Sequence, residues 1–338
     1  MPIKQRVRLG WIKLTQYEYW PWWMLYLPVV PLWIFEALWS GRIRYFMAVN
    51  PGLPRSGFYG ADKKAILDRI PERYKPHALQ VSAQKGMDDV PEGWHFPFIV
   101  KPLKGQRGKG VRRIENAAQW KQYVAAVEED FILQEYVPYR LELAVLYYRM
   151  PGATRGRITS VTQKEFLHVT GNGQYTVTEL VRQNPRAAMQ YGRLKDQFDT
   201  DFWNAIPDFR TRIELEPIGN HCRGTRFIAA NYMIDKQLER IFDDIANNIE
   251  GFHYGRYDLR VASLEDLYRG ENIRILELNG VNADPAHIFD NRHGLFNSVR
   301  DLYKHSRLIG KIARKNMSQR AHNLKPQTLE PQSTFQNQ

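Results

Sequence analysis

The stretch YGRYDLRVASLEDLYRGENIRILELNGVNADPAHIFD, residues 254–290, contains two segments in which apolar and polar residues alternate. This alternation predicts one strand over residues 253–261 and a second over residues 273–279. Alternate residues of a strand share a face, so Glu277 and Asn279 point to the same side of the second strand. Asp258 lies in the first strand, which can pair alongside. The pattern therefore predicts a sheet that gathers two carboxylates and one amide.

These three side chains suit a Mg²⁺ site. Mg²⁺ takes a few protein oxygens and completes its coordination with water and substrate phosphates. Arg256 lies two residues before Asp258 and hence on the same face, where a cation would stabilise an anionic reaction centre. The alternative interpretation is an ordinary sheet with a few surface carboxylates, because a short D…E-x-N pattern is unspecific by itself.

The composition is that of a globular protein with an anionic partner. The chain has 338 residues, of which 43% are hydrophobic and 25% charged, enough to bury a core in about one to three domains. A net charge of +12 indicates a nucleotide, an anionic membrane surface or a nucleic acid. We expect no nucleic-acid partner, because no binding motif for one accompanies the charge. The single cysteine, Cys222, excludes an internal disulfide and fits a reducing compartment.

Residues 1–48 form a basic and aromatic arm. The segment 19–39 contains five tryptophans and one charged residue, Glu36, and basic residues flank it on both sides. Three prolines and the scattered tryptophans argue against a simple spanning helix. We expect the arm to lie in the interface of an anionic membrane or to form a re-entrant hairpin, in a cytoplasmic protein that is peripheral on the cytoplasmic face. The alternatives are a spanning helix, packing on the protein's own core, and contact with a second subunit in a homodimer.

The rest of the chain divides into three further parts. Residues 49–95 are predicted to form a Gly/Pro loop and a short helical linker. Residues 96–312 alternate between strand and helix patterns and form the main domain. Residues 313–338 are polar, show no apolar period and are predicted to be a disordered tail.

A cationic loop opens the main domain. A predicted strand over residues 96–102 carries Lys101 and leads into a glycine-rich loop, whose backbone amides and charges could cover a polyphosphate although it is neither a Walker A nor a G-x-G-x-x-G loop. Further strands over residues 131–137, 141–149 and 157–166 carry Glu142 and Lys164 and would form an antiparallel sheet beneath the loop. The loop residues are Lys104, Gly105, Arg107, Gly108, Lys109 and Gly110.

The order of these residues resembles the ATP-grasp superfamily of carboxylate–amine ligases, including cyanophycin-synthetase-like, glutathione-synthetase-like and D-alanine–D-alanine-ligase-like members. Residues 169–181, VTGNGQYTVTELV, are similar to the VxGDGxxTxxELV stretch of the first two groups, with Asn172 in place of aspartate. On physical grounds, Thr176 and Glu179 of this stretch form a capping box that begins a helix. The resemblance implies an α+β fold, in which two α/β subdomains with antiparallel sheets clasp ATP.

The resemblance also implies a role for each residue. The loop would close over the phosphates of ATP, and Mg²⁺, as two ions, would lie between those phosphates and the carboxylates. Arg256 would stabilise an acyl phosphate, with Arg223 as a second candidate. The implied ligands are Lys101 and Lys164 for phosphate, Gln134, Glu135 and Val137 for adenine, Glu142 for ribose, and Asp258, Glu277 and Asn279 for Mg²⁺.

These roles predict an ADP-forming ligase that joins an unidentified carboxylate to an unidentified amine, with the acceptor side near Asn282, Asp284 and His287. Only about 95 residues precede residue 96, so we expect the separate N-terminal substrate domain usual in the family to be absent and the substrate to be lipidic or membrane-associated. One alternative is a kinase-like phosphotransferase that acts on a hydroxyl. Another is a nucleotide-binding membrane scaffold without turnover.

Overall fold

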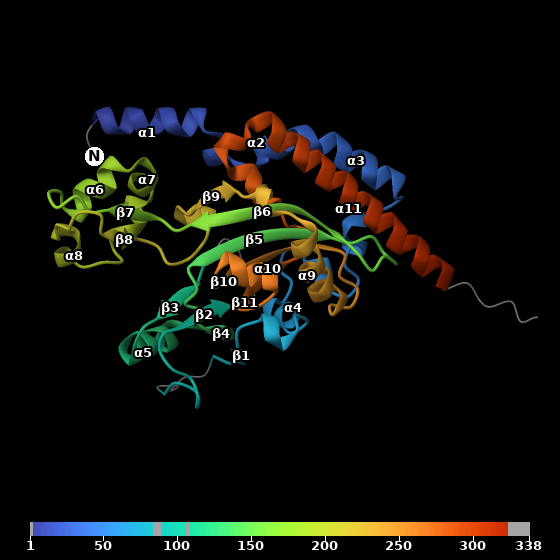
Figure 1. Ribbon diagram of the computed structural model, residues 1–338, viewed down its shortest axis with the longest axis horizontal. Helices are drawn as coiled ribbons and strands as arrows, with labels where there is room; N and C mark the ends of the chain where they lie inside the picture. The colour runs from blue at the N-terminus through green and yellow to red at the C-terminus, as the bar shows by residue number, and fades with distance from the viewer. Residues whose placement is uncertain (1–2, 84–88, 106–107, 324–338) are drawn as a thin grey trace, which may run out of the picture.

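The computed structural model describes residues 3–83, 89–105 and 108–323. It contains a five-stranded sheet, a four-stranded sheet and a two-stranded sheet, with a layer of helices along one side (Figure 1). Arg107 and residues 324–338 of the predicted tail lie outside the described residues. Both larger sheets are antiparallel, as expected for the α+β fold implied by the sequence.

The five-stranded sheet separates an apolar core from a polar face. Alternate residues Leu143, Val145, Tyr257 and Leu259 are fully buried in one cluster with Phe242 and its neighbours on α9 (Lys236–Asn247). The residues between them point the other way and include the charged residues of the predicted site. The strands follow the order β11 (Ile273–Asn279), β10 (Tyr254–Val261), β5 (Leu141–Tyr148), β6 (Arg157–Glu165) and β9 (Arg226–Ala229).

The four-stranded sheet has its own core. Phe98, Trp120 and Phe131 are buried together where α5 (Ala117–Ala126) covers the sheet. The segment 131–135 pairs with residues 98–102 here, so the prediction that it shares a sheet with residues 141–149 was wrong. The chain changes sheet at Pro138, which has no N–H to donate to a strand ladder. The strands follow the order β1 (Ala78–Val81), β4 (Phe131–Glu135), β2 (Phe98–Pro102) and β3 (Arg112–Ile114).

Two expected boundaries need correction. β1 lies inside the predicted linker 49–95, but it pairs with β4 and is part of the four-stranded sheet. Helix α11 (Leu295–Asn323) continues beyond Ile312, so residues 313–323 are not a disordered tail. The reason is an apolar face that the polar composition hid, because Ile309, Ala313 and Met317 follow one another at four-residue intervals and pack against the core.

A small subdomain carries the stretch 169–181. Its two-stranded sheet and three helices enclose a separate cluster that includes Val181, Leu194 and Trp203. The predicted capping box is present, with Thr176 and Glu179 bonded reciprocally at the start of α6. The elements are β7 (His168–Thr170), β8 (Arg212–Glu214), α6 (Val177–Gln183), α7 (Pro185–Leu194) and α8 (Thr200–Asn204).

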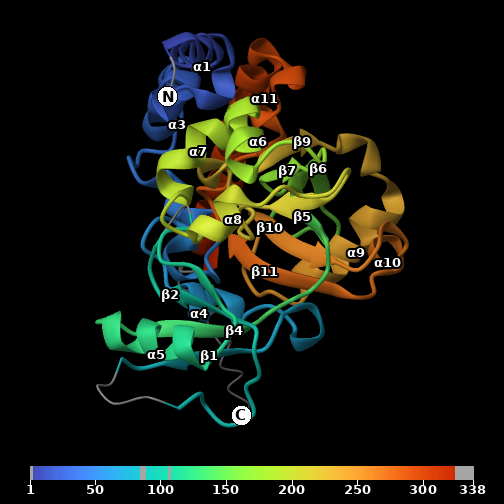
Figure 2. The same cartoon turned by 90° about the vertical axis from the view of Figure 1, so that its left-hand side faces the viewer.

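The N-terminal arm packs on α11. Leu25, Val29 and Leu32 are buried against Leu302 of α11, and the fully buried Glu36 forms an ion pair with Arg314. The arm and α11 lie together at the end opposite the four-stranded sheet (Figures 1 and 2). The helices are α1 (Ile3–Thr15), α2 (Trp22–Tyr26) and α3 (Val30–Trp39). The inner half of the arm therefore packs on the protein's own core.

Within the described residues, the segment Trp22–Trp39 is the one helical segment long and apolar enough to cross a membrane, and 22% of it is buried inside the protein. By itself this is weak evidence, because a core helix of similar composition would pass the same criterion. The remaining short helices are α4 (Lys63–Leu67) and α10 (Leu264–Arg269), which flank β11 and β10.

Candidate active site

The predicted metal ligands form a group across β10 and β11. The register places Asp258 opposite Glu277 and Arg256 opposite Asn279. The Asn279 amide donates to Asp258 Oδ2 at 2.8 Å. The Arg256 guanidinium donates to both Asp258 oxygens, at 3.2 and 3.1 Å. Cross-strand pairing thus brings together all four residues that the alternation pattern placed on one face.

The neighbouring strands add a second ring of charge. Lys164 Nζ on β6 lies 3.0 Å from Glu142 Oε1 and 3.1 Å from Asp258 Oδ1. The Arg260 guanidinium on β10 donates to Glu142 Oε2 at 2.9 Å and to the Val137 carbonyl at 2.7 Å. Glu142, the implied ribose ligand, is therefore held between two cations. Sequence reasoning missed Arg260, although it lies two residues after Asp258 and so shares its face.

The two large sheets contact each other at a bulge beside the site. The register of β10 and β11 shifts between Asp258 and Leu259, and the Lys101 ammonium of the four-stranded sheet donates to the Leu276 carbonyl at 3.2 Å. Bulges frequently lie beside active sites because they redirect one strand locally. Lys63 Nζ of α4 lies 3.1 Å from Glu277 Oε1. No local sequence signal identified Lys63, which is distant from β11 along the chain.

These contacts fix the ionisation of the carboxylates. Burial would raise the pKa of Asp258, but Arg256 and Lys164 outweigh it and lower the pKa to about 2. Burial would also raise the pKa of Glu277, yet the Lys63 ammonium holds it below its usual range. Burial lowers the pKa of Lys101 to about 8. Both carboxylates are thus anionic at neutral pH, the form that coordinates a metal ion.

The donor set fits Mg²⁺. Asp258, Glu277 and Asn279 supply hard oxygen ligands from adjacent strands, and Mg²⁺ binds such oxygens together with substrate phosphates. Arg256, Lys164 and Lys63 already compensate the buried negative charge. These three cations therefore fix the positions of the carboxylates. They are also groups of the kind that bind phosphate.

The glycine loop and Arg223 lie together, apart from this cluster. Gly108 adopts φ +70°, and a Cβ built there would lie 3.5 Å from Arg223 Cδ. The Arg223 guanidinium pairs with the buried Glu216 at 3.2 Å. Among the described residues, Lys104 and Lys109 have no acidic partner, and both are exposed. Two cations thus remain available for an anion at the loop, whereas no contact joins Arg223 to Asp258 in the described part of the chain.

The predicted adenine hinge contains an unsatisfied amide. Gln134 is 3% exposed, and its Oε1 is buried without a hydrogen-bond partner. Such a buried acceptor is costly unless a ligand supplies a donor, and an adenine amino group is a suitable donor. Glu135 follows at the end of β4, where its carboxylate accepts from the His77 backbone N–H at 3.1 Å.

The arm reaches the predicted acceptor side. Tyr26 of α2 shares a side-chain hydrogen bond with Asp284, and the Asp284 carbonyl accepts from Arg256 at 3.2 Å. Burial raises the pKa of Asp284, and the opposing effect of the hydrogen bond from Tyr26 is smaller. The neighbouring Asn282 has a buried Oδ1 without a partner. The arm therefore contacts the segment that follows the metal ligands, a link that the sequence did not reveal.

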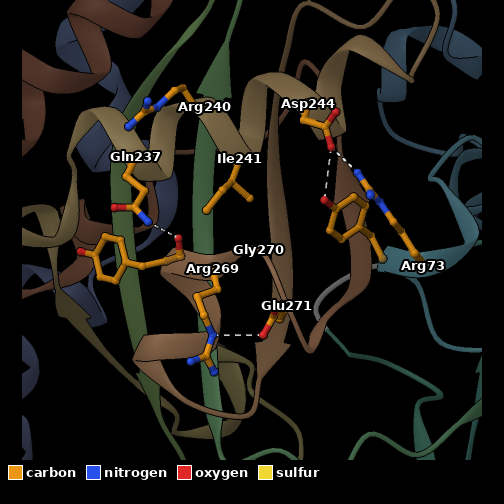
Figure 3. A pocket seen from close by; sticks show the side chains of 10 residues that line it. Arg73, Gln237, Arg240, Ile241, Asp244, Arg269, Gly270 and Glu271 are labelled. Carbon is orange, nitrogen blue, oxygen red and sulfur yellow. Dashed lines mark hydrogen bonds and ion pairs between the residues drawn. The ribbon is translucent and has the colours of Figure 1, made fainter.

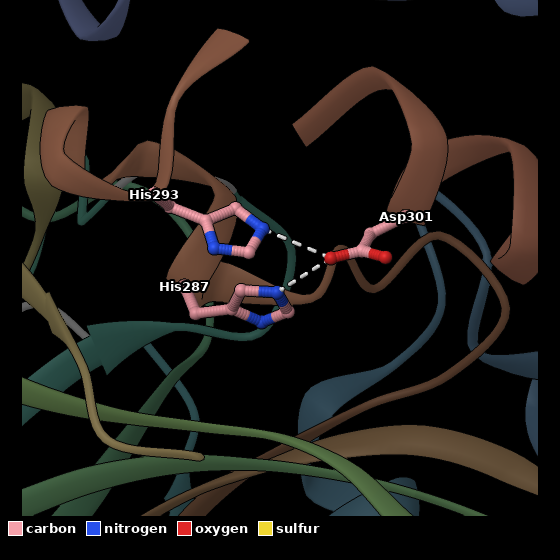
Figure 4. Close-up of side chains that lie close together, drawn as sticks. All are labelled: His287, His293 and Asp301. Atoms are coloured by element: carbon pink, nitrogen blue, oxygen red, sulfur yellow. Dashed lines mark hydrogen bonds and ion pairs between the residues drawn. The ribbon is translucent and has the colours of Figure 1, made fainter. Parts of the chain in front are cut away.

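Both ring nitrogens of His287 have partners within the protein. Its Nδ1 is bonded to Ser160 at 2.7 Å, and its Nε2 lies 3.2 Å from Asp301 of α11. His293 bonds the same carboxylate oxygen at 2.9 Å, so the fold assembles a group of two histidines and an aspartate (Figure 4). The spacing along the sequence gave no sign of this group.

A surface pocket between α9 and α10 lies elsewhere. Its volume is about 710 Å³, and its lining includes Arg73, Gln237, Asp244 and Glu271 (Figure 3). None of the residues predicted for the site lines it. The charged lining is largely paired, for example Arg73 with Asp244.

Part of the chain is similar to known proteins. Residues 74–192 match the family model of the ATP-grasp domain, and the predicted resemblance to the carboxylate–amine ligase type is confirmed. Cyanophycin synthetase from Synechocystis sp. is 29% identical over 90 residues, which are 25% of this chain and 10% of that protein. The chain thus spans a small part of the length of this curated relative.

Solved structures with a partial likeness include two ligases. D-alanine–D-alanine ligase from Bacillus anthracis has 13% identity and a TM-score of 0.42, covering 78% of this chain and 69% of that one. A bifunctional glutathione synthetase from Pasteurella multocida has 13% identity and a TM-score of 0.33, covering 72% and 38%. ATP-grasp ligases in general use ATP together with Mg²⁺.

Proposed function

We propose that the protein is an ATP-dependent ligase that joins a carboxylate to an amine. The single observation that supports this most is the buried Asp258 carboxylate, which lies at hydrogen-bond distance from Asn279, Arg256 and Lys164. Glu277 lies opposite it on β11. A substrate carboxylate would attack the γ-phosphate of ATP, forming an acyl phosphate and ADP. The amine would then attack the acyl carbon, and phosphate would leave. This sequence needs positioned charge rather than a side-chain nucleophile.

The residues have distinct tasks in this proposal. Lys101 and Lys164 bind phosphate oxygens, while Lys104 and Lys109 approach from the loop. Arg256 stabilises the charge that develops on the acyl phosphate. Asp258, Glu277 and Asn279 would hold Mg²⁺, as two ions, which when bound neutralises phosphate charge.

We further propose that the arm docks on an anionic membrane. Among the described residues, more than half of the exposed large apolar side chains lie within residues 3–43. On α1 they form one stripe, Ile3, Val7, Trp11 and Leu14, with exposures of 80, 67, 66 and 66%. Such a patch on a monomer marks an interaction surface, and tryptophans beside exposed basic residues suit the membrane interface. The basic residues are Lys4, Arg6, Arg8, Lys13, Arg42 and Arg44.

Membrane docking would determine the substrate class. The hydrogen bond between Tyr26 and Asp284 links the arm to the acceptor side of the site. An arm that lies in the bilayer interface would place this side near the headgroup region. We therefore propose an amphiphilic, membrane-associated substrate and a location on the cytoplasmic face of the membrane.

The reaction is tested by measuring ADP, phosphate and product with candidate carboxylate and amine pairs. The proposal expects ADP and free phosphate in equal amounts, and loss of both in Asp258→Ala and Glu277→Ala. A stable phosphorylated product would favour phosphotransfer instead, and full turnover in both variants would refute the metal site. Mass spectrometry of lipids from cells with wild-type protein or Asp258→Ala would then identify the substrate.

A further inference from the structure

A second polar pocket lies between α11 and the five-stranded sheet. Its volume is about 560 Å³, and the sheet residues Tyr148 and Thr159 contribute to its lining. Arg300, Lys304, Arg307 and Lys311 of α11 also line it. Because these cations follow one another at intervals of four, three and four residues, they form one stripe on the helix.

The pocket has an excess of positive charge. Its lining contains those four cations and one carboxylate, Asp301. Lys304 lies 3.0 Å from Asp301, and Arg307 lies 3.7 Å from Glu36 of the arm. Lys311 has no acidic partner among the described residues. The pocket therefore has more cationic groups than its own carboxylate can neutralise.

The two histidines bonded to Asp301 do not favour a metal ion here. Both imidazoles are hydrogen-bonded to the same oxygen, Asp301 Oδ2. The Lys304 ammonium donates to the other oxygen, Oδ1. A divalent cation would have to displace these bonds beside four positive side chains, at a Coulombic cost. Instead, the triad fixes α11 to η8 (Ala286–Phe289) and η9 (Asn291–His293) and thus shapes the wall of the pocket.

An unsatisfied hydroxyl adds a donor to the pocket. Thr159 Oγ1 is buried without a hydrogen-bond partner, and Thr159 is one of the lining residues. Phosphate oxygens accept hydrogen bonds from hydroxyl, ammonium and guanidinium groups together. The combination of charge and a free donor fits a phosphate group.

We propose that this pocket binds the phosphate of an anionic phospholipid headgroup and thereby orients the arm on the membrane. The proposal rests on the membrane docking proposed above. The exposed Phe296 and Tyr303 lie on α11 beside the basic stripe, and α11 lies with the arm at one end of the molecule (Figures 1 and 2). The exposed apolar side chains of the arm would enter the bilayer, and the pocket would bind one headgroup at the bilayer surface.

The test is co-sedimentation of the full chain with two kinds of vesicle: phosphatidylcholine alone, and phosphatidylcholine with equimolar phosphatidylglycerol. We expect Arg300→Gln/Lys311→Gln to lower affinity for the anionic vesicles about 25-fold, because each juxtamembrane cation contributes about fivefold. Binding to pure phosphatidylcholine should not change. The matched control is Lys236→Gln/Arg240→Gln on α9, which removes the same charge from an exposed surface away from α11 and should leave both affinities unchanged.

Each other outcome has a definite meaning. An equal loss in the control variant would overturn the pocket and leave only a general charge effect. Inorganic phosphate that binds the soluble protein and leaves vesicle binding intact would assign the pocket to free phosphate. Zn²⁺ binding by calorimetry that is lost in His293→Ala would assign it to a metal. If wild-type protein binds neither kind of vesicle, membrane docking itself fails, whereas unchanged binding in the pocket variant refutes the headgroup site alone.

Discussion

The candidate active site and the N-terminal arm depart from ordinary protein surfaces in opposite ways. The site buries charge, since Lys101, Lys164 and Asp258 are each less than 9% exposed. The arm exposes apolar surface, with Leu38 at 76% and Trp11 at 66%. Buried charges need compensation, and large exposed apolar patches need a partner.

The two regions differ in how far the protein itself compensates the buried charge or covers the exposed apolar surface. At the site, nearly every charge already has a partner, so a ligand has to fit an arrangement that exists without it. At the arm, the inner face is packed on α11 but the outer face has no counterpart among the described residues. The charges of the candidate site are thus compensated within the protein, whereas the outer face of the arm is left for the partner that we propose, an anionic membrane.

The largest effect is expected at the site. Asp258→Asn keeps the size of the side chain but removes the charge that Arg256 and Lys164 compensate. Loss of one such electrostatic group should lower turnover about 100- to 1,000-fold. Asp244→Asn, on the exposed side of α9, is the matched control and should retain turnover. Steady-state release of ADP measures both, and equal rates for the two variants would contradict the site.

A smaller effect is expected from the outer face of the arm. Trp11→Ser/Trp23→Ser removes two exposed indoles and should weaken vesicle binding about 10- to 100-fold, because buried aromatic area is lost. ATP binding in solution should not change. Phe209→Ser/Tyr232→Ser removes exposed rings outside the arm and serves as the control. Unchanged vesicle binding together with a change from dimer to monomer in sedimentation analysis would show that a second subunit covers the face.

The inner face of the arm can be tested by its buried ion pair. Glu36→Gln removes the charge opposite Arg314 and Arg307 and should cost about 2 kcal/mol of unfolding free energy, the value of a charged hydrogen bond. Urea denaturation measures this loss. Glu265→Gln, which removes an exposed partner of Arg269 on α10, should change stability much less, because water screens an exposed ion pair. If the two variants lose the same amount, the arm is not anchored through Glu36.

The smallest effect concerns acid stability at the junction of arm and sheet. Burial would raise the pKa of Asp290, but Arg292 and the Ala229 backbone N–H lower it to about 2. Because this pKa lies below the unfolded value of about 3.9, the stabilisation is complete above that value and disappears as the pH falls toward 2. Thermal unfolding of Asp290→Asn should therefore be less pH-dependent over this interval than that of the wild type. Parallel curves would contradict the assignment.

Local patterns predicted much of the fold. Alternation defined β10 and β11 closely, and it placed Arg256 and Asp258 on one face and Glu277 with Asn279 on the matching face of the partner strand. The capping box at Thr176 was equally visible.

The contacts that complete the site were not predictable from local patterns. Lys63 reaches Glu277 and Tyr26 reaches Asp284 only because the fold brings distant segments together. The pairing of residues 131–135 in the four-stranded sheet was missed for the same reason. The periodicity of one strand does not identify the strand with which it pairs. The end of α11 was misjudged because a narrow apolar stripe was outweighed by its polar composition.

The most direct test of the central claim is trapping of the acyl phosphate. Wild-type protein, ATP, Mg²⁺ and a carboxylate-bearing membrane lipid extract are incubated with hydroxylamine, which converts an acyl phosphate to a stable hydroxamate. Our account predicts ATP-dependent hydroxamate formation, with ADP and phosphate released in step, and no hydroxamate with Asp258→Asn. ADP release accompanied by a stable phosphorylated lipid, without any hydroxamate, would contradict it.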